Sequence, residues 1–199
     1  MELTEATLAR EVCFTALDFE TTGTTRGYKS LPWQLGAIQF RIGEPLSDAP
    51  LFDTLIGVPP EHPFSKHAPG THLEQRSAIL AAPPFHTLWP ALHQALSQTL
   101  PTAHNCATER NLLLHFAPMT RYPHWVDTLP LTRRIYPGLS SYALEDLIPQ
   151  LGLQAQLSAY FPHRAPHDAT YDAYACALLL QHLLSLPGWK DIPLTDILA

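Results

Sequence analysis

The segment Phe14-Thr15-Ala16-Leu17-Asp18-Phe19-Glu20-Thr21-Thr22-Gly23 ends an apolar run with two carboxylates and a turn. Residues i and i+2 of a β-strand point to the same face, so Asp18 and Glu20 are expected to lie side by side. Two carboxylates this close raise each other's pKa and repel one another unless a cation lies between them. The segment therefore predicts a strand whose end carries a site for a hard, oxygen-binding metal ion.

The composition is that of a globular chain of modest charge. Its 199 residues are enough for one domain that buries a core without disulfides, and we expect a single domain over residues 1–199. The net charge of −6, with only 12 Lys and Arg residues, excludes a broadly cationic nucleic-acid coat, because non-specific phosphate binding grows with the number of basic contacts. A small, metal-assisted nucleic-acid site remains compatible with this charge.

The cysteines and the N-terminus indicate where the protein resides. Cys13, Cys106 and Cys176 are odd in number and form no Cys-x-x-Cys pair, which favours buried, reduced thiols over disulfides or a zinc site. The first residues lack a basic region followed by an apolar block, and no apolar run approaches the length of a membrane span. We therefore expect a cytoplasmic protein without a membrane partner.

Apolar runs separated by turn residues predict three strands in the first third of the chain. They cover residues 12–18, 33–42 and 51–58, and their short connections favour an antiparallel meander. Short strands are also expected at 101–103 and 125–129, and a polar lead-in or short helix at 1–11. Helical spacing of apolar residues predicts helices over 84–100, from Asn105 as N-cap through Phe116, and over 131–136, 141–151 and 169–185. This succession is typical of an α/β layer fold.

Prolines and histidines replace any regular pattern between Pro59 and Gly70, which predicts an irregular surface segment. His62, His67 and His72 recur every five residues, which matches neither a helix face nor a strand. Solvent-exposed loop histidines are therefore the default interpretation, and a zinc site is the weaker alternative.

Three segments, in chain order, carry a family resemblance: Asp18-x-Glu20-Thr21-Thr22-Gly23, His104-Asn105-x-x-x-Glu109, and His167-x-x-x-x-Asp172-Ala173-x-Ala175. Their order and spacing resemble the three motifs of DEDDh-type 3′–5′ exonucleases, a family that includes the proofreading ε subunit of bacterial DNA polymerase III and RNase T. The resemblance covers about residues 12–185. It implies a ribonuclease-H-like, three-layer α/β/α fold with a mixed, roughly five-stranded sheet.

The resemblance also implies a metal site. Two Mg²⁺ or Mn²⁺ ions would be held by carboxylate oxygens, the donors that these hard cations prefer. Asp18 would bridge both ions, Glu20 and Asp172 would hold the ion that presents the nucleophilic water, and Glu109 would reach the second ion.

The same family pattern assigns a base and substrate contacts. His167 would be the general base that takes the proton from the attacking water, a task suited to a group that titrates near neutrality. The backbone at Thr21 and Thr22 would contact the terminal nucleotide. His104 and Asn105 are further candidate substrate contacts, although a structural role fits His104 better within the family pattern.

One position departs from the family, and one motif can be aligned in two ways. Glu109 stands where many members carry Asp, and its extra methylene group is compatible with a water-mediated ligand. The alternative for Glu109 is an ordinary first-turn Glu favoured by the helix dipole. His163 and Asp168 repeat the His-x-x-x-x-Asp spacing four residues before His167 and Asp172. We choose the later pair, with Asp168 as a helix N-cap and His163 as a loop residue.

These features predict a 3′–5′ exonuclease that releases nucleoside 5′-monophosphates from single-stranded DNA or RNA 3′ ends, with DNA slightly favoured. The alternatives are a non-catalytic nucleic-acid-binding or adaptor module on the same fold and, more remotely, a metal-binding regulatory protein that uses the histidine-rich segment. Residues 156–161 faintly resemble sliding-clamp-binding peptides of replication proteins, with an ordinary loop as the favoured interpretation. A replication or repair partner and the oligomeric state are left open.

Overall fold

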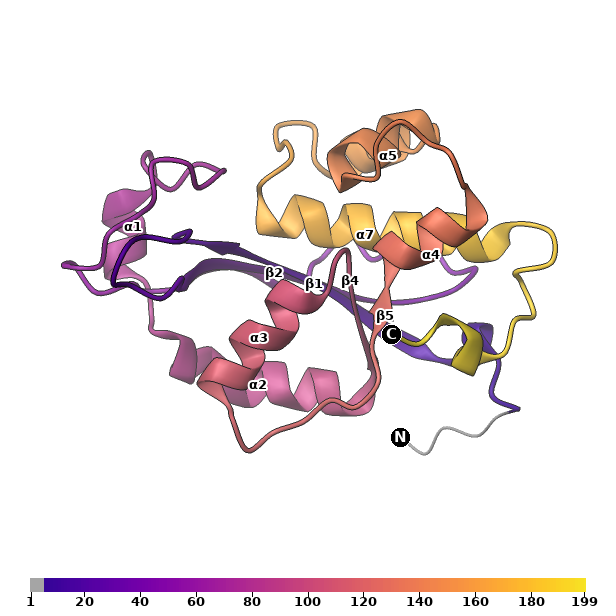
Figure 1. Ribbon diagram of the computed structural model, residues 1–199, viewed down its shortest axis with the longest axis horizontal. Coiled ribbons are helices and arrows are strands. Elements are labelled where there is room, and N and C mark those ends of the chain that lie inside the picture. Colours follow the sequence, from indigo (N-terminus) through magenta and orange to yellow (C-terminus); the bar gives the residue numbers. More distant parts are fainter. Residues whose placement is uncertain (1–5) are drawn as a thin grey trace.

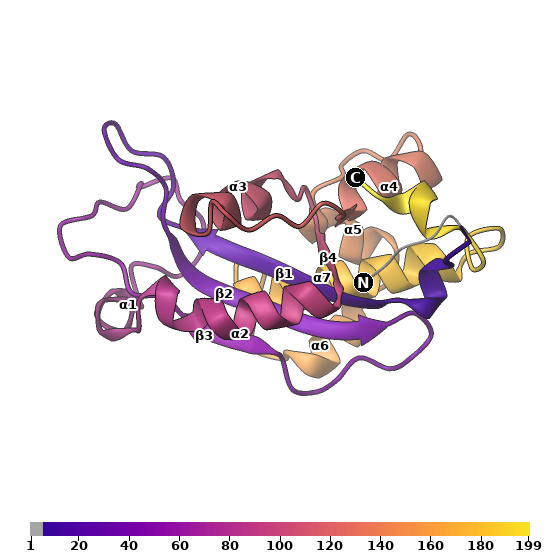
Figure 2. The same ribbon diagram turned by 90° about the horizontal axis from the view of Figure 1, so that it is seen from below.

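The computed structural model describes residues 6–199 and has a central sheet between two helical layers (Figures 1 and 2). The strand order in the sheet is β3-β2-β1-β4-β5. The strands are β1 (Cys13–Thr21), β2 (Pro32–Arg41), β3 (Phe52–Leu55), β4 (Leu100–Ala103) and β5 (Val126–Asp127). The first three pair antiparallel, whereas β4 and β5 join in parallel, so the predicted meander and mixed sheet are confirmed.

The helices cover both faces of this sheet. They are α1 (Arg76–Ala81), α2 (Phe85–Gln98), α3 (Ala107–Phe116), α4 (Thr128–Ile135), α5 (Leu144–Gln150), α6 (Gln154–Tyr160) and α7 (Ala169–Ser185). Helices α2 and α3 cover one face, whereas α7, with α4 and α5 outside it, covers the other (Figures 1 and 2). Short 3₁₀ turns at Ala9–Glu11 and Leu194–Ile197 complete the elements, and residues 1–5 of the predicted lead-in lie outside the described chain.

Three local predictions need correction. Asn105 does not cap α3: its backbone φ is +64°, and no side-chain cap bond is formed at the start of that helix. Helix α4 begins at Thr128, inside the predicted strand, because the Asp127 carboxylate caps it by accepting from the backbone N–H of Leu129. The clamp-like segment is not a loop, since it lies mostly in α6, where Leu157 is buried.

Alternation along β1 decides which face carries the carboxylates. Phe14 and Ala16 belong to the core beneath α7, whereas Leu17 and Phe19 belong to the core beneath α2 and α3. Since side chains two residues apart share a face, Asp18 and Glu20 point to the α7 side. The predicted pairing of these two carboxylates therefore follows from the pleat of one strand.

Gly36 allows α7 to approach the sheet at that place. It pairs with Asp18 across β1 and β2. A Cβ atom on Gly36 would lie 2.1 Å from the carbonyl oxygen of Ala169, the first residue of α7. Because the obstructing atoms belong to the backbone, any side chain here would push the start of α7 away from the carboxylate face of β1.

We expect Gly36→Ala to lower the free energy of unfolding by about 3 kcal/mol, the upper end of the usual overpacking cost, because backbone rather than a flexible side chain must move. Urea denaturation measures this change. The control is Gly43→Ala, where φ is +84° and the space around a Cβ is open, so that only about 1 kcal/mol of backbone strain is expected. Equal losses in both variants would contradict the role given to Gly36.

Candidate active site

Four carboxylates converge from three elements. β1 contributes Asp18 and Glu20, α3 contributes Glu109 from its first turn, and α7 contributes Asp172 from its first turn. Glu20 and Glu109 are buried, with 6% and 3% of their surface exposed, whereas Asp18 and Asp172 are half-buried. The structure thus brings together acidic residues that lie more than 150 positions apart in the sequence.

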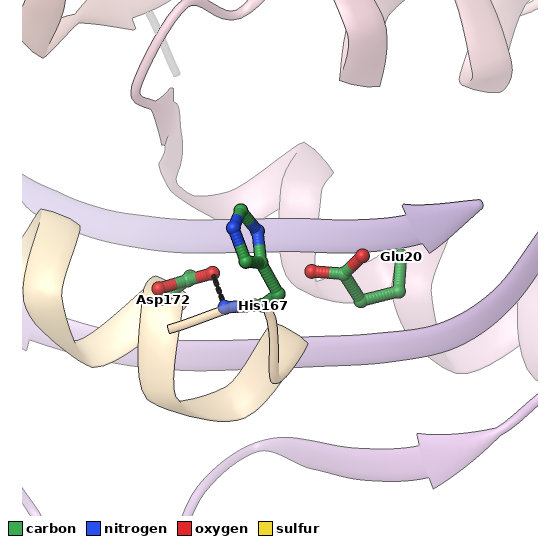
Figure 3. A group of neighbouring side chains, drawn as sticks. All are labelled: Glu20, His167 and Asp172. Carbon is green, nitrogen blue, oxygen red and sulfur yellow. Dashed lines mark hydrogen bonds between the residues drawn. The ribbon is translucent and has the colours of Figure 1, made fainter. Parts of the chain in front are cut away.

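Glu20, Asp172 and His167 form the tightest group (Figure 3). Each offers one ligand atom, and these three atoms all lie within 4.8 Å of one another. The backbone N–H of His167 donates to Oδ2 of Asp172 over 2.9 Å, which fixes the entry of the chain into α7. The His167 side chain stays 47% exposed, so that its ring meets solvent while the carboxylates lie deeper.

Burial and mutual repulsion raise the pKa values of these carboxyl groups. Burial, followed by the charges of Asp172 and Asp168, raises the pKa of Glu20 to about 8. Burial also raises the pKa of Asp172 to about 7, against the opposing hydrogen bond from His167. The pKa of Asp18 is raised well above its ordinary value by burial and by neighbouring charges, of which that of Glu109 is the largest.

Glu109 carries a clear sign of a missing partner. Its Oε2 atom is buried and accepts no hydrogen bond. Burial, together with the charges of Asp127 and Glu20, raises the pKa of Glu109 to about 8. Leaving a buried acceptor unsatisfied costs about 1–3 kcal/mol, and more for a charged group. A set of converging carboxylates with an unpartnered oxygen fits a hard divalent cation.

A polar network holds the first turn of α7 against β2. Asp168 caps the helix by accepting from the backbone N–H groups of Thr170 and Tyr171, as predicted. Gln34 of β2, opposite Glu20, donates to Asp168 over 3.1 Å and accepts from the N–H of Ala169 over 3.2 Å. Our sequence reasoning missed Gln34, although an amide inside an apolar strand was the available signal.

Arg164 completes this network from the segment before His167. Its guanidinium binds Asp53 of β3 and, over 3.0 Å, Asp168. Thr170 also donates to Asp53 over 2.8 Å. These contacts join the acidic start of α7 to the edge strand. Sequence reasoning missed Asp53 and Arg164, because nothing local marks two residues 111 positions apart as partners.

The two His-x-x-x-x-Asp pairs that could represent the last motif lie in different surroundings. His167 and Asp172 lie beside Glu20, whereas His163 is an exposed residue between α6 and α7. His167 adopts a φ of +67°, a conformation that costs a non-glycine residue about 1–2 kcal/mol. Strained residues of this kind cluster at functional sites. The geometry therefore favours the later pair.

His104 and Asn105 lie at the start of α3 but differ in availability. Both ring nitrogens of His104 contact protein, Nδ1 at 2.8 Å from Oγ1 of Thr128 and Nε2 at 2.8 Å from the carbonyl oxygen of Tyr142. Burial lowers the pKa of His104, so the neutral ring is favoured. Asn105 is exposed, and its backbone N–H donates to Asp127. The contacts of His104 are those of a structural residue.

The histidine-rich segment is packed more closely than expected. His62 is buried, and its Nε2 lies 3.3 Å from Oγ1 of Thr22. His72 is also buried, stacked on Phe64. The expectation of exposed histidines is therefore wrong for these two and holds only for His67. The segment folds back onto the end of β1, and among the described residues the three histidines form no metal-compatible group.

Cys106 and Cys176 are buried and Cys13 is half-buried, and all three are free thiols. Within residues 6–199, none of the helices is both long and apolar enough to cross a membrane.

Comparisons with known proteins agree with this geometry. The sequence model of the RNase T family, described as exonuclease, matches residues 15–179. Exodeoxyribonuclease 10 of Escherichia coli K12 is 26% identical over 181 residues, which cover 91% of this chain and 73% of that protein.

Solved structures share the fold. Exonuclease X in complex with 5′ overhanging duplex DNA is 23% identical, with a TM-score of 0.63 over 92% of this chain and 98% of that one. The nuclease domain of 3′hExo, a DEDDh family member bound to rAMP, is 11% identical, with a TM-score of 0.70 over 95% of this chain and 98% of that one. These likenesses confirm the predicted ribonuclease-H-like fold. The chain therefore belongs to the RNase T family of exonucleases.

Proposed function

We propose that the protein is a divalent-metal-dependent 3′–5′ exonuclease that releases nucleoside 5′-monophosphates. The observation that carries the proposal is the convergence of four carboxylates, one with an unpartnered buried oxygen, beside the half-exposed imidazole of His167. A non-catalytic binding module would have no need to bury such mutual repulsion.

The proposed substrate is a single-stranded or overhanging nucleic-acid 3′ end, with DNA slightly favoured over RNA. The similarity to a protein named as an exodeoxyribonuclease supports DNA. The related fold of Exonuclease X was solved with 5′ overhanging duplex DNA, and that of Escherichia coli Exonuclease I with a dT13 oligonucleotide.

The residues have separate tasks in this proposal. Asp18, Glu20, Glu109 and Asp172 would hold two Mg²⁺ or Mn²⁺ ions, which when bound stabilise the attacking and leaving oxygens of an in-line displacement at phosphorus. The solvent-exposed ring of His167 accepts the proton of the attacking water.

Thr21, half-buried and directly after Glu20, is the proposed contact to the terminal nucleotide. The predicted contact at Thr22 is wrong, because Thr22 is fully buried and its N–H and carbonyl already bind Leu31 and Ser65. Asn105 adds an exposed amide at the start of α3.

The first test determines the direction of digestion, the preferred nucleic acid and the role of His167 as general base. Purified protein is incubated with 5′-labelled single-stranded DNA, single-stranded RNA and mismatched duplex, each in Mg²⁺ and in Mn²⁺. We expect stepwise shortening from the 3′ end, and a loss of about 10²–10⁴-fold in rate for His167→Ala, the usual contribution of a general base.

The matched control is His163→Ala, which removes an exposed histidine four residues earlier and should leave the rate unchanged. Failure to shorten any substrate would contradict the proposed function. Equal losses in the two histidine variants would contradict only the role of His167.

The second test uses the pH dependence of stability without metal. The pKa values of Glu20 and Glu109 rise from about 4.5 to about 8 on folding, so the folded state binds more protons than the unfolded state between these values. Stability must then fall as the pH rises through this window. We expect the melting temperature in EDTA to drop between pH 5 and pH 8, and Mn²⁺ to restore it at pH 8.

Glu109→Gln should flatten this pH dependence and stabilise the metal-free protein at pH 8, because it removes a buried charge, while it abolishes most exonuclease activity. Glu74→Gln, at an exposed position, is the control for loss of one negative charge. If Glu109→Gln keeps full activity and the full metal-induced shift, Glu109 is not part of the site.

A further inference from the structure

Glu145 is an exposed carboxylate in the first turn of α5 that reaches the candidate active site. Its Oε2 atom lies 3.5 Å from Nε2 of His167. After burial, the charges of Asp168 and Glu145 contribute to the raised pKa of Asp172. Asp146 stands beside Glu145 in the same turn, but in the described part of the chain no ion pair involves Asp146. The contact with His167 therefore distinguishes Glu145 from an ordinary first-turn acidic residue that the helix dipole favours.

Packing fixes the place of Glu145. Leu147 and Ile148, two and three positions later in α5, are buried in the core that contains α7 (Figure 1). Ahead of the helix, the carbonyl oxygen of Tyr142 lies 2.8 Å from Nε2 of His104. The first turn of α5 is therefore anchored to α7 and to the segment before α3.

The backbone of His167 is fixed from two sides, whereas its ring is not. Its N–H donates to Oδ2 of Asp172 over 2.9 Å. A Cβ atom on Gly70 would lie 2.9 Å from the carbonyl oxygen of His167, so the histidine-rich segment packs against this peptide unit. The ring itself is 47% exposed and lies between the carboxylates of Glu20 and Asp172 (Figure 3). Such a half-exposed side chain can change its rotamer unless a contact holds it.

The chemistry of the imidazole gives this contact a consequence. A neutral imidazole carries its proton on one nitrogen and accepts at the other, and the hydrogen bond made by one nitrogen decides this choice. An ionised carboxylate can only accept, so Glu145 favours the proton on Nε2 and leaves Nδ1 of His167 as the acceptor. At 3.5 Å the contact is longer than a hydrogen bond, but contacts of catalytic groups often tighten when the substrate binds.

We propose that Glu145 is a positioning residue that orients the ring of His167 and keeps Nε2 protonated, so that Nδ1 takes the proton of the attacking water. The inference rests on the proposed function, in which His167 is the general base. In that step the water oxygen bonds to phosphorus and its proton passes to Nδ1. The bond from phosphorus to the leaving 3′ oxygen breaks, and this oxygen takes up a proton from solvent. The resulting imidazolium faces Glu145, which stays ionised throughout.

The test measures single-turnover cleavage of 5′-labelled single-stranded DNA in Mn²⁺, with protein in excess so that product release does not limit the rate. Glu145→Gln should lower the rate about 10-fold, the lower end of the range for removing a group that orients a residue of a metal site, because solvent partly replaces a half-exposed carboxylate. Glu145→Asp, which keeps the charge, should recover part of the loss. Asp146→Asn, the control in the same turn, should cleave like the wild type.

A double-mutant cycle separates positioning from a structural role. If Glu145 acts through the ring of His167, Glu145→Gln should cause no further loss in a His167→Ala protein. A further loss of the same size in that background would overturn the inference. A loss of Mn²⁺ affinity in Glu145→Gln as large as that in Asp172→Asn would overturn it too, since Glu145 would then be a metal ligand.

The position of the ring proton is measured without turnover. In the metal-free protein labelled with ¹⁵N-histidine, and with His167→Ala for assignment, the nitrogen chemical shifts of His167 should show the proton on Nε2 in the wild type and a loss of this preference in Glu145→Gln. Equal tautomer populations in the two proteins would overturn the inference. If the wild-type protein shortens no DNA while the tautomer still depends on Glu145, the proposed function fails and the contact stands, so the two failures are distinguishable.

Discussion

Repulsion between buried carboxylates is the constraint on which the rest of this structure depends. Asp18, Glu20, Glu109 and Asp172 raise one another's pKa values, and burial adds to each shift. A flexible chain would relieve this repulsion by separating the groups. The central position of β1 in the sheet, with α3 and α7 on opposite faces, prevents the separation. The fold therefore holds the carboxylates in a mutually repulsive arrangement, and a bound cation gains affinity because it relieves this repulsion.

Neutral and cationic neighbours prevent further uncompensated negative charge around the four carboxylates. Gln34 supplies both an amide donor and a carbonyl acceptor to the first turn of α7, so that a buried polar contact is made without a further charge. Arg164 forms ion pairs with Asp53 and Asp168, so these two carboxylates have a cationic partner. Asp168 can therefore cap α7 next to the metal-compatible group without adding a fully uncompensated carboxylate.

Local and long-range determinants explain which sequence predictions held. The strand meander, the helix from Ala169 and the Asp168 cap depend on period and on residues next to one another, and all three are confirmed. The proposed Asn105 cap was wrong because Asp127, 22 positions away, binds the start of α3 instead. The exposed histidines were wrong for His62 and His72 because segment 59–75 folds back onto β1, a contact that no local pattern encodes.

The sequence by itself determined the carboxylate pair on β1, since a period of two places Asp18 and Glu20 on one face whatever surrounds them. It also determined the family pattern, because motif order and spacing survive without knowledge of packing. Only the tertiary structure decided the depth of Glu109, the unpartnered state of its Oε2 atom and the approach of α7 at Gly36. Burial and close contact arise between residues far apart in the chain, so they become defined only when the sheet and both helical layers have assembled.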